Sequence, residues 1–403
     1  MKKTLLATTA LGALATFAAA GAMAAEAPTW KLTGNANFQF YWVDQDLVAF
    51  DTGTSQWASP GGRITSSYTT AYTVLSLGSH VQDHGWYFGV DEAELQLNVS
   101  GTADNGLNYG FKIEINANTT DGAVADEVRL QLSGSWGTLQ MGDEDGAEDI
   151  MNYGGEDLMG ATGGFDGDFD DVLIRERDFV ISGIPTDTVG AAPSYPTIVG
   201  DTGDSTKISY FSPRFSGFQV GASLTPTPND GDQFKSDGLW ENHIGLGANY
   251  DNSFGDLRIR ASAVYSGAKS LRPAYGIQDI SAWSVGGIVG WGPFSLGANY
   301  TDNGDSWSYT PFDSYDRSYW DVAAAFETGP LYLSAGYFEG TVEAASGVTN
   351  YENTFTTIAL TADYTMAPGL GVYAEVDMID DDQNGTNIDN SATIFIAGMN
   401  VSF

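Results

Sequence analysis

The chain of 403 residues carries 52 Asp and Glu against 16 Lys and Arg, a formal charge of −36, and contains no Cys. This acidic balance excludes nucleic-acid binding, which needs a basic surface, and the lack of Cys excludes disulfide scaffolds and thiolate zinc sites. Fifty glycines, about 12 % of the chain against a usual ~7 %, disfavour helices and, with 13 % aromatic residues, favour strands and turns. Composition therefore predicts a large, acidic, all-β protein.

The N-terminal segment predicts export from the cytoplasm. Lys2 and Lys3 precede an apolar run of small residues, and Ala22-Met23-Ala24 then matches a signal-peptidase site. We predict a signal peptide over 1–24 and one mature domain over 25–403. An N-terminal membrane anchor is the alternative, disfavoured because no basic flank follows the apolar run. Removing Lys2 and Lys3 leaves 14 basic residues against 52 acidic ones.

A second uncharged run, 281–301, is long enough to cross a bilayer as a helix. Its five glycines and the central Pro293 would cost a helix several kcal/mol. Apolar residues instead alternate with small or polar ones, apart from Ile288, on both sides of Gly292-Pro293. That period of two predicts a pair of strands around a turn.

The same alternation recurs along the whole chain and predicts sixteen strands. These are 30–42, 92–101, 107–117, 127–133, 138–142, 205–212, 218–224, 239–250, 256–265, 281–291, 294–301, 318–327, 331–338, 353–364, 370–377 and 391–403. Seven short turns alternate with eight longer segments. The longer segments are 44–91, 118–126, 143–204, 225–238, 266–279, 303–317, 339–352 and 378–390. Long loops at one end and short turns at the other are typical of an outer-membrane barrel.

Alternation alone does not separate a soluble β-sandwich from a membrane barrel, because strands of both have one apolar and one polar face. The apolar face packs in the core of a sandwich but meets lipid in a barrel. The predicted export, the even strand count and the aromatic residues near strand ends favour the barrel. Most of the predicted strands also have about the ~9–11 residues that a spanning strand needs.

Four short motifs carry a family resemblance: 95–101 (LQLNVSG), 130–142 (LQLSGSWGTLQMG), 208–213 (ISYFSP) and the terminal 399–403 (MNVSF). Together, in this order, they resemble the Gram-negative general porins, especially the alphaproteobacterial type. The resemblance implies an all-β fold: a transmembrane antiparallel β-barrel of 16 strands with short periplasmic turns, long external loops and a third loop folded into the lumen. It also implies homotrimers in the cell outer membrane and, at Phe403, a signal for the outer-membrane assembly machinery. The first long loop, 44–91, is larger than the family leads us to expect.

The third long loop, 143–204, is the segment that the resemblance places at the constriction. It carries many carboxylates, among them Asp166, Asp168 and Asp170, and also apolar residues such as Phe165 and Phe169 that could be buried. A loop of ~60 residues without a function is uncommon in a compact domain. The alternative is a solvated acidic surface loop.

Strand alternation turns several charged residues toward the lumen. Lys112 and Arg129 are expected to be neighbours at a similar height, with Glu94 near the cross-strand position of Lys112. A basic wall facing the acidic loop would set a transverse field, whereas ordinary salt bridging in the lumen is the alternative. The predicted pore-lining residues are Glu94, Lys112, Glu114, Arg129, Asp166, Asp168, Asp170, Arg258 and Arg260.

The sequence gives little support for catalysis or for a cofactor. It has three His and neither a Gly-x-Ser-x-Gly nor a His-Glu-x-x-His motif, although a Ser–His pair involving His243 stays open. Asp380, Asp382 and Asn384, followed by Gly385, match the opening of a calcium loop. The position expected to hold Glu is Ser391, so a plain acidic hairpin tip is favoured over structural Ca²⁺.

We therefore expect a non-enzymatic channel for passive diffusion of small hydrophilic solutes and ions, with a preference for cations. Its expected partners are the outer-membrane bilayer, two further copies of the chain, the assembly machinery and the solutes. An outer-membrane barrel hydrolase and a secreted calcium-binding β-protein are the alternatives from other classes.

Overall fold

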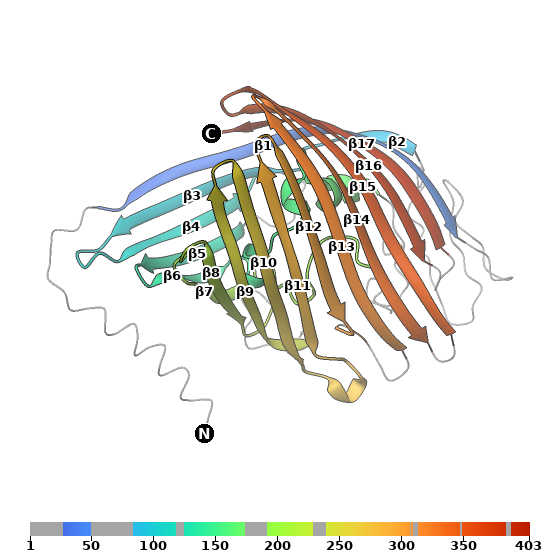
Figure 1. Cartoon of the computed structure of the whole chain (residues 1–403), viewed down its shortest axis with the longest axis horizontal. Coiled ribbons are helices and arrows are strands. Elements are labelled where there is room, and N and C mark those ends of the chain that lie inside the picture. The colour runs from blue at the N-terminus through green and yellow to red at the C-terminus, as the bar shows by residue number, and fades with distance from the viewer. Residues whose placement is uncertain are drawn as a thin grey trace.

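Antiparallel strands make up almost all of the secondary structure (Figure 1). The computed structural model describes residues 27–49, 84–117, 125–173, 192–228, 239–306, 308, 313–346, 349–383 and 388–403. The predicted signal peptide lies outside these residues. Within them, none of the helices is long and apolar enough to cross a membrane.

In the part of the chain that the structure describes, seventeen strands follow one another in chain order. Their bounds are β1 Thr29–Ala49, β2 His84–Gly89, β3 Ala93–Thr102, β4 Asn108–Asn116, β5 Ala125–Gly134, β6 Gly137–Asp143, β7 Thr206–Phe211, β8 Phe218–Thr225, β9 Trp240–Phe254, β10 Leu257–Ser270, β11 Ile280–Trp291, β12 Phe294–Gly304, β13 Asp313–Thr328, β14 Leu331–Ser346, β15 Thr349–Ala367, β16 Leu370–Gln383 and β17 Ile388–Ser402. Each strand pairs antiparallel with the next, apart from β2 and β3, which both pair with β1. Because β1 also pairs with β17, the sheet closes into a barrel.

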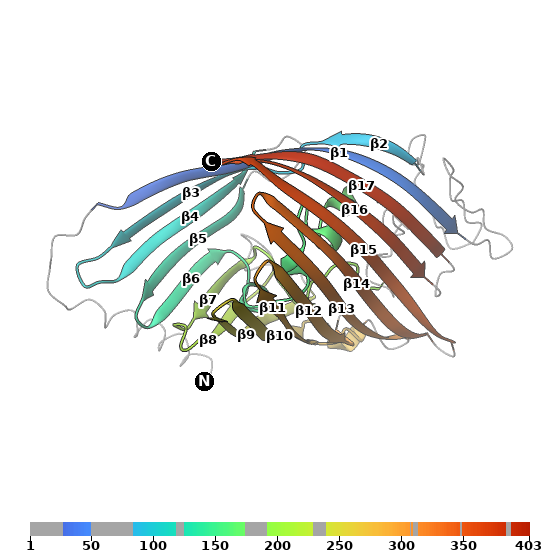
Figure 2. The same cartoon turned by 45° about the horizontal axis from the view of Figure 1, so that its top comes forward.

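The closed barrel has sixteen positions because β2 and β3 share one edge of β1. β2 pairs with the 39–44 part of β1 and β3 with the 29–36 part, so they lie end to end along the same neighbour (Figure 2). The predicted closed antiparallel barrel of sixteen strands is confirmed, with one extra strand. The extra strand β2 lies within the segment 44–91, which the sequence predicted as loop.

A β-bulge separates β2 from β3. Gly89 is opposite Gln39 and Ala93 is opposite Ala36, so four residue steps on this side match three on β1. The Asn37 side chain accepts hydrogen bonds from the backbone N–H groups of Asp91 (3.0 Å) and Glu92 (2.9 Å), which satisfies the donors that the bulge frees. Because of the extra residue, the apolar side chains of β3 point outward; without it they would point into the barrel.

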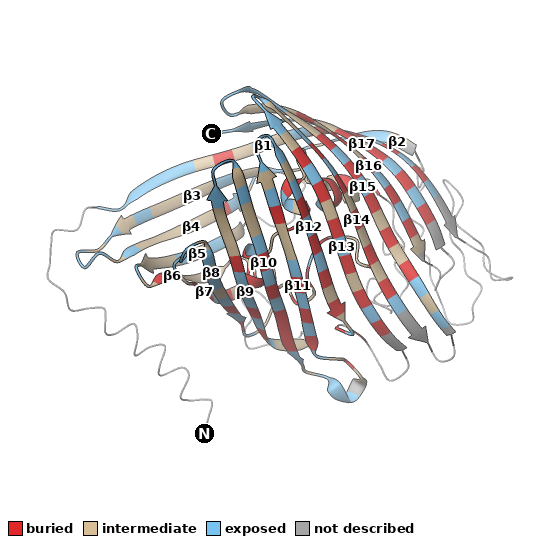
Figure 3. Cartoon of the chain, in the orientation of Figure 1, coloured by how far each residue is buried: buried red, intermediate tan, exposed pale blue. Residues whose placement is uncertain are grey.

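Burial alternates along the strands, as Figure 3 shows for β11 to β16. On β11, Trp283 and Val285 are exposed on the outer face, while Ala282 and Ser284 are fully buried on the inner face. Most strands thus expose apolar residues outward and keep small or polar residues inside, the reverse of a soluble protein. Ile288, the apolar exception noted in the sequence, is buried inside, in the same apolar cluster as Leu158.

The short turns occur where the sequence predicts them. Two-residue turns at Gly292-Pro293 and Gly329-Pro330 begin with glycines at φ 54° and 58°, which other residues adopt only with strain. At the other end of the barrel the strands are longer than predicted. There β14, β15 and β16 extend into the predicted loops 339–352 and 378–390. The ends of these strands that lie far from the short turns are rich in polar residues, so they lack the apolar alternation by which a strand is predicted.

Candidate functional site

Lys112 and Arg129 lie directly opposite each other on β4 and β5, as expected from their positions in the sequence. Both side chains are bound to carboxylates. Lys112 Nζ is 2.5 Å from Glu114 and 2.6 Å from Glu127, and Arg129 forms an ion pair with Glu144. Glu94 does not sit across from Lys112 as expected, since its partner on β4 is Asn116 and that of Lys112 is Asn98.

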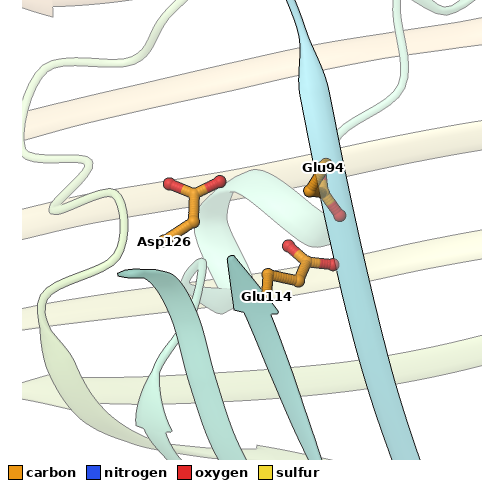
Figure 4. Close-up of side chains that lie close together, drawn as sticks. All are labelled: Glu94, Glu114 and Asp126. Atoms are coloured by element: carbon orange, nitrogen blue, oxygen red, sulfur yellow. The ribbon is translucent and has the colours of Figure 1, made fainter. Parts of the chain in front are cut away.

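Further carboxylates gather around this pair. Glu94, Glu114 and Asp126 form one group whose carboxylate oxygens lie within 4.8 Å of one another (Figure 4). Glu127, Asp145 and Asp204 form a second group. The inner wall at β3–β5 is therefore acidic around its two basic residues, and the expected basic wall is replaced by ion pairs. Burial raises the pKa of Glu144, although Arg129 beside it acts in the opposite direction.

The two predicted arginines of β10 differ in position. Arg258 binds Asp251 at 2.8 Å close to the β9–β10 turn, and its side chain is 57 % exposed. Arg260 is half-buried further along the strand, where its guanidinium lies 5.0 Å from the Tyr153 ring and 3.9 Å from Asp157. Only Arg260 therefore contacts the segment that follows β6.

That segment, described over 144–173 and 192–205, runs across the inner-face side chains of many strands. It contains the short helix α2 Ala147–Ile150 and the 3₁₀ turns η1 Glu156–Leu158, η2 Gly164–Asp166 and η3 Asp168–Asp171. Helix α2 contacts β7 to β10, η1 contacts β12 and β13, and η2 contacts β14 to β16. These helical pieces appear in green within the curve of the sheet (Figure 1).

Carboxylates of the barrel wall bind backbone N–H groups of this segment. Asp321 on β13 accepts from Gly155 N at 2.6 Å, and Asp363 on β15 accepts from Ala161 N at 2.9 and 3.0 Å. Glu375 on β16 accepts from the backbone N–H groups of Thr162 and Gly164 and from the Thr162 hydroxyl. These wall residues fix the path of the segment, and none of them is among the pore-lining residues predicted from the sequence.

Apolar contacts reinforce the same path. Phe165 and Phe169 are fully buried; Phe165 stacks on Phe338 with ring centroids 5.9 Å apart, and Phe169 stacks on Phe355 at 6.3 Å. The prediction that these loop residues have apolar surface to bury is confirmed.

Inward-facing glycines let the segment lie directly against the wall. A Cβ at Gly297 would lie 2.7 Å from the carbonyl oxygen of Gly154, and one at Gly247 would lie 2.8 Å from that of Ala147. Glycine within a strand often marks a place where another backbone comes close. The sequence contains this signal at Gly247, Gly286 and Gly297, where we expected strands but no close approach of another segment.

The three predicted loop carboxylates have different surroundings. Asp166 is exposed and Asp170 is half-buried. Asp168 accepts a hydrogen bond from the Gln39 side chain, and burial, opposed by that bond and aided by Asp91, raises the pKa of Asp168 to about 8.

The remaining predicted residues lie in the last two strands. Asp380 and Asp382 belong to β16, where they pair with Ser391 and Asp389 of β17, and Asn384 lies outside the described residues. The first two thus have extended backbone where a calcium loop was considered. Phe403 exchanges two backbone hydrogen bonds with Gly34, of 3.0 and 3.2 Å, at the seam between β17 and β1.

A hollow of about 800 Å³ opens on β3–β5, and Lys112, Arg129, Asn98 and Gln131 are among its lining residues. A closed barrel with this polar interior and an inward segment after β6 has the architecture of a channel. A family model described as Gram-negative porin matches residues 7–384.

The chain belongs to the Gram-negative porin family. An uncharacterized protein of Rickettsia conorii is 23 % identical to this porin in an alignment 409 positions long, which covers 86 % of this chain and 85 % of the relative. One from Rickettsia typhi is 21 % identical, with 77 % and 83 % covered.

Solved structures of a porin and of another outer membrane protein share the fold. The anion-selective porin from Comamonas acidovorans is 15 % identical, with a TM-score of 0.59, and the match covers 94 % of this chain and all of that one. A trimer form of OmpT, an outer membrane protein of Vibrio cholerae, is 16 % identical with a TM-score of 0.58 and the same coverage. This porin is accordingly an outer-membrane channel protein, whose outer face meets lipid and whose inner face encloses the lumen.

Proposed function

We propose that this porin is a water-filled channel for passive diffusion of small hydrophilic solutes and that it prefers cations. We also propose that the segment after β6, as described over 144–173 and 192–205, narrows its lumen. The observation that carries the preference is the charge balance on the inner wall. Lys112, Arg129, Arg258 and Arg260 are all paired with carboxylates. Further carboxylates remain around them, so a mobile cation meets net negative charge.

Reversal potentials across planar bilayers test the preference. In a KCl gradient we expect the sign that corresponds to K⁺ crossing faster than Cl⁻, more strongly at low salt, where screening is weak. Anion selectivity would overturn it. Liposome swelling with uncharged sugars of increasing size tests the passive, size-limited passage, and uptake that does not depend on size would contradict it.

Substitution of two glycines tests whether the segment narrows the lumen. Gly297→Val introduces a side chain where the Gly154 carbonyl lies, so it should displace the segment and change the single-channel conductance. Gly290→Val is the matched control, because the three atoms nearest to a Cβ there belong to Ser295, Arg258 and Phe294 and not to the segment. Equal conductance in both variants would refute the constriction.

The alternative of a barrel hydrolase gains no support from His243. Its Nδ1 lies 3.4 Å from the carbonyl oxygen of Gly200, and its Nε2 has no hydrogen-bond partner among the residues that the structure describes. A serine nucleophile would need to lie within hydrogen-bond reach of that ring. We infer a channel without catalysis, and hydrolysis of generic ester substrates by the purified porin would contradict this.

We also propose that the porin assembles as a homotrimer through the outer-membrane assembly machinery. The trimer form of the Vibrio cholerae protein supports the first part, and the apolar alternation that ends at Phe403 supports the second. Chemical crosslinking in native membranes should give trimers, and a purely monomeric pattern would contradict the assembly.

A further inference from the structure

The hollow on β3–β5 has a glycine at its centre. Gly110 of β4 pairs with Ser100 of β3 on one side and with Gln131 of β5 on the other. Inward side chains recur at every second residue of a strand, so a further row of three inward positions lies on either side of this one. The three rows across β3, β4 and β5 are Asn98, Lys112 and Arg129; Ser100, Gly110 and Gln131; and Thr102, Asn108 and Ser133. All of these residues line the hollow.

Gly110 gives the hollow its floor. A Cβ there would lie 2.3 Å from the carbonyl oxygen of Val99, so the position has no room for a side chain. Strands lie about 4.8 Å apart and rise about 3.3 Å per residue, so the three rows cover roughly 10 Å by 13 Å of wall. The volume of about 800 Å³ falls within the range of ~300–1,000 Å³ that is usual for small-molecule sites. A solute of one or two rings would fit on this floor.

The hollow is open to the lumen. The helical pieces of the segment after β6 lie against β7 to β10 and β12 to β16. None of the described residues that line the hollow belongs to that segment. A solute that diffuses past the segment therefore meets this part of the wall directly.

Neutral hydrogen-bonding groups predominate among the lining side chains. They include the carboxamides of Asn98, Asn108 and Gln131 and the hydroxyls of Ser100, Thr102 and Ser133. The Gln131 oxygen accepts from Gln140 at 3.3 Å, and the Asn108 oxygen accepts from Thr102 at 2.8 Å. The N–H groups of both amides donate to no other group in the described part of the chain, so they are available to a solute. A carboxamide donates and accepts hydrogen bonds, and so does a hydroxyl.

The charged lining residues do not favour an ion. Lys112 and Arg129 are both ion-paired with carboxylates, which an anion would have to displace. A cation would meet these two positive side chains, and Asp104 in the β3–β4 turn is the carboxylate among the described lining residues. Lys31, opposite Asn98 on β1, is not among them. The hollow is therefore better matched to a solute without net charge.

We propose that this glycine-centred hollow is a docking site for an uncharged, polyhydroxylated solute of the size of a mono- or disaccharide. The proposal rests on the channel function proposed above and names its substrate class. Hydroxyl groups of the solute exchange hydrogen bonds with the carboxamides of the rim while a ring lies over Gly110. A channel needs binding that is favourable enough for entry and weak enough for release. Hydrogen bonds that replace those to water meet this need, because each is weak in net terms.

Saturation-transfer NMR on the purified porin in a sugar-free detergent tests the proposal with sucrose as the probe, because it detects weak binding without transport. The transfer to sucrose should saturate with concentration in the wild type. Asn98→Ala/Gln131→Ala should raise the concentration for half-saturation at least tenfold, and circular dichroism checks its fold. Asn98→Ala alone, with an expected rise of at least threefold, takes its place if the double variant does not fold.

Gln96→Ala is the matched control. It removes an amide two residues from Asn98 on the inner face of β3, and Gln96 is not among the described lining residues. Its half-saturation should stay within twofold of the wild-type value. An equal loss in this variant and in Asn98→Ala/Gln131→Ala would mean that sucrose adsorbs to the polar wall in general, and it would overturn the docking site. Equal half-saturation in the wild type and the double variant would do the same.

Charged probes test the solute class. Glucose should displace sucrose at lower concentration than either gluconate or protonated glucosamine, and the reverse order would refute a site for uncharged solutes. Planar-bilayer conductance of the same preparation tests the channel separately. A conducting porin that does not bind sucrose refutes the docking site and not the channel. A porin that binds sucrose without conducting refutes the channel and supports the docking site.

Discussion

Lys112 and Arg129 face each other across the β4–β5 ladder, two positive side chains in adjacent strands, and each is held by different carboxylates. Like charges directly opposite each other destabilise a sheet. Glu114 and Glu127 on one side and Glu144 on the other offset that repulsion, so the two cations and their partners form one network in the channel wall.

Replacing both cations with Glu should therefore raise cation selectivity. The double variant Lys112→Glu/Arg129→Glu removes two positive charges and adds two negative ones to a wall that is already acidic. Reversal potentials should shift toward the K⁺ equilibrium potential, most clearly at low salt. Because the side chains face the lumen and not lipid, where charge at mid-bilayer costs about 2–4 kcal/mol, the barrel should still assemble.

Cysteine labelling provides the control for this orientation. Water-soluble thiol reagents should label Cys at positions 112 and 129 and fail to label Cys at 111 and 128, whose native side chains are on the outer face. The opposite pattern would mean that the facing of β4 and β5 is inverted.

Asp363 should hold the inward segment in place through the backbone of Ala161. Asp363→Ala removes the acceptor of that N–H and should destabilise the porin by about 1.5–3 kcal/mol, the range for hydrogen bonds to charged groups. Open-channel current noise should increase because the segment is less firmly held. Asp363→Asn, which keeps one acceptor oxygen, should have a smaller effect, and Glu343→Ala, at an exposed position of β14, should have none.

Glu148 should make stability depend on pH. Its side chain is 2 % exposed, and burial raises its pKa, opposed by hydrogen bonds that include one from Ser223 at 2.7 Å, while Asp201 raises it and Lys207 lowers it. A raised pKa means that the folded state binds the proton more tightly than the unfolded state. The stabilisation is thus fully present below the ordinary Glu value of about 4.3 and is lost as the pH rises through the folded value.

Glu148→Gln removes this titration. Melting temperatures measured at pH 4 and pH 8 should fall with rising pH less steeply in Glu148→Gln than in the wild type. Glu343→Gln serves as the control for removing an exposed carboxylate. A wild-type profile that Glu148→Gln leaves unchanged would rule out Glu148 as its source.

Phe403 should affect assembly in two separable ways. Deleting the residue removes both backbone hydrogen bonds to Gly34, whereas Phe403→Ala keeps them and removes only the exposed ring. If the ring is the assembly signal, both variants should reach the outer membrane poorly in fractionation experiments. If seam closure is what matters, only the deletion should fail, and normal levels of both would contradict either role.

The strands could be predicted from the sequence because the outer face of the barrel must be apolar, as Trp283 and Val285 illustrate. β2 could not, since a bulge breaks the alternation between it and β3 and the segment was absorbed into a long predicted loop. The paired positions of Lys112 and Arg129 followed from counting residues away from short turns. Counting failed for Glu94, because the register across the β3–β4 turn places Asn98, not Glu94, opposite Lys112.

The partners of the charged residues could not be read from local pattern at all. Arg129 binds Glu144, 15 residues away, and Asp321 binds the backbone of Gly155, 166 residues away. Such contacts depend on the path of the segment after β6, and that path is set by wall residues from the far half of the chain. Ile288 is a sequence signal of that path, because it is an apolar side chain at an inward position where a small or polar residue is expected.

Wall carboxylates bind the segment after β6 through its backbone N–H groups, and this has an evolutionary consequence. Asp321, Asp363 and Glu375 bind N–H groups that almost every amino acid offers, at Gly155, Ala161, Thr162 and Gly164. Side chains that point from the segment into the water path can therefore be exchanged by mutation without loosening its anchorage. A lineage could retune which solutes pass by substituting residues such as Asp166, while the barrel and the course of the chain inside it stay the same.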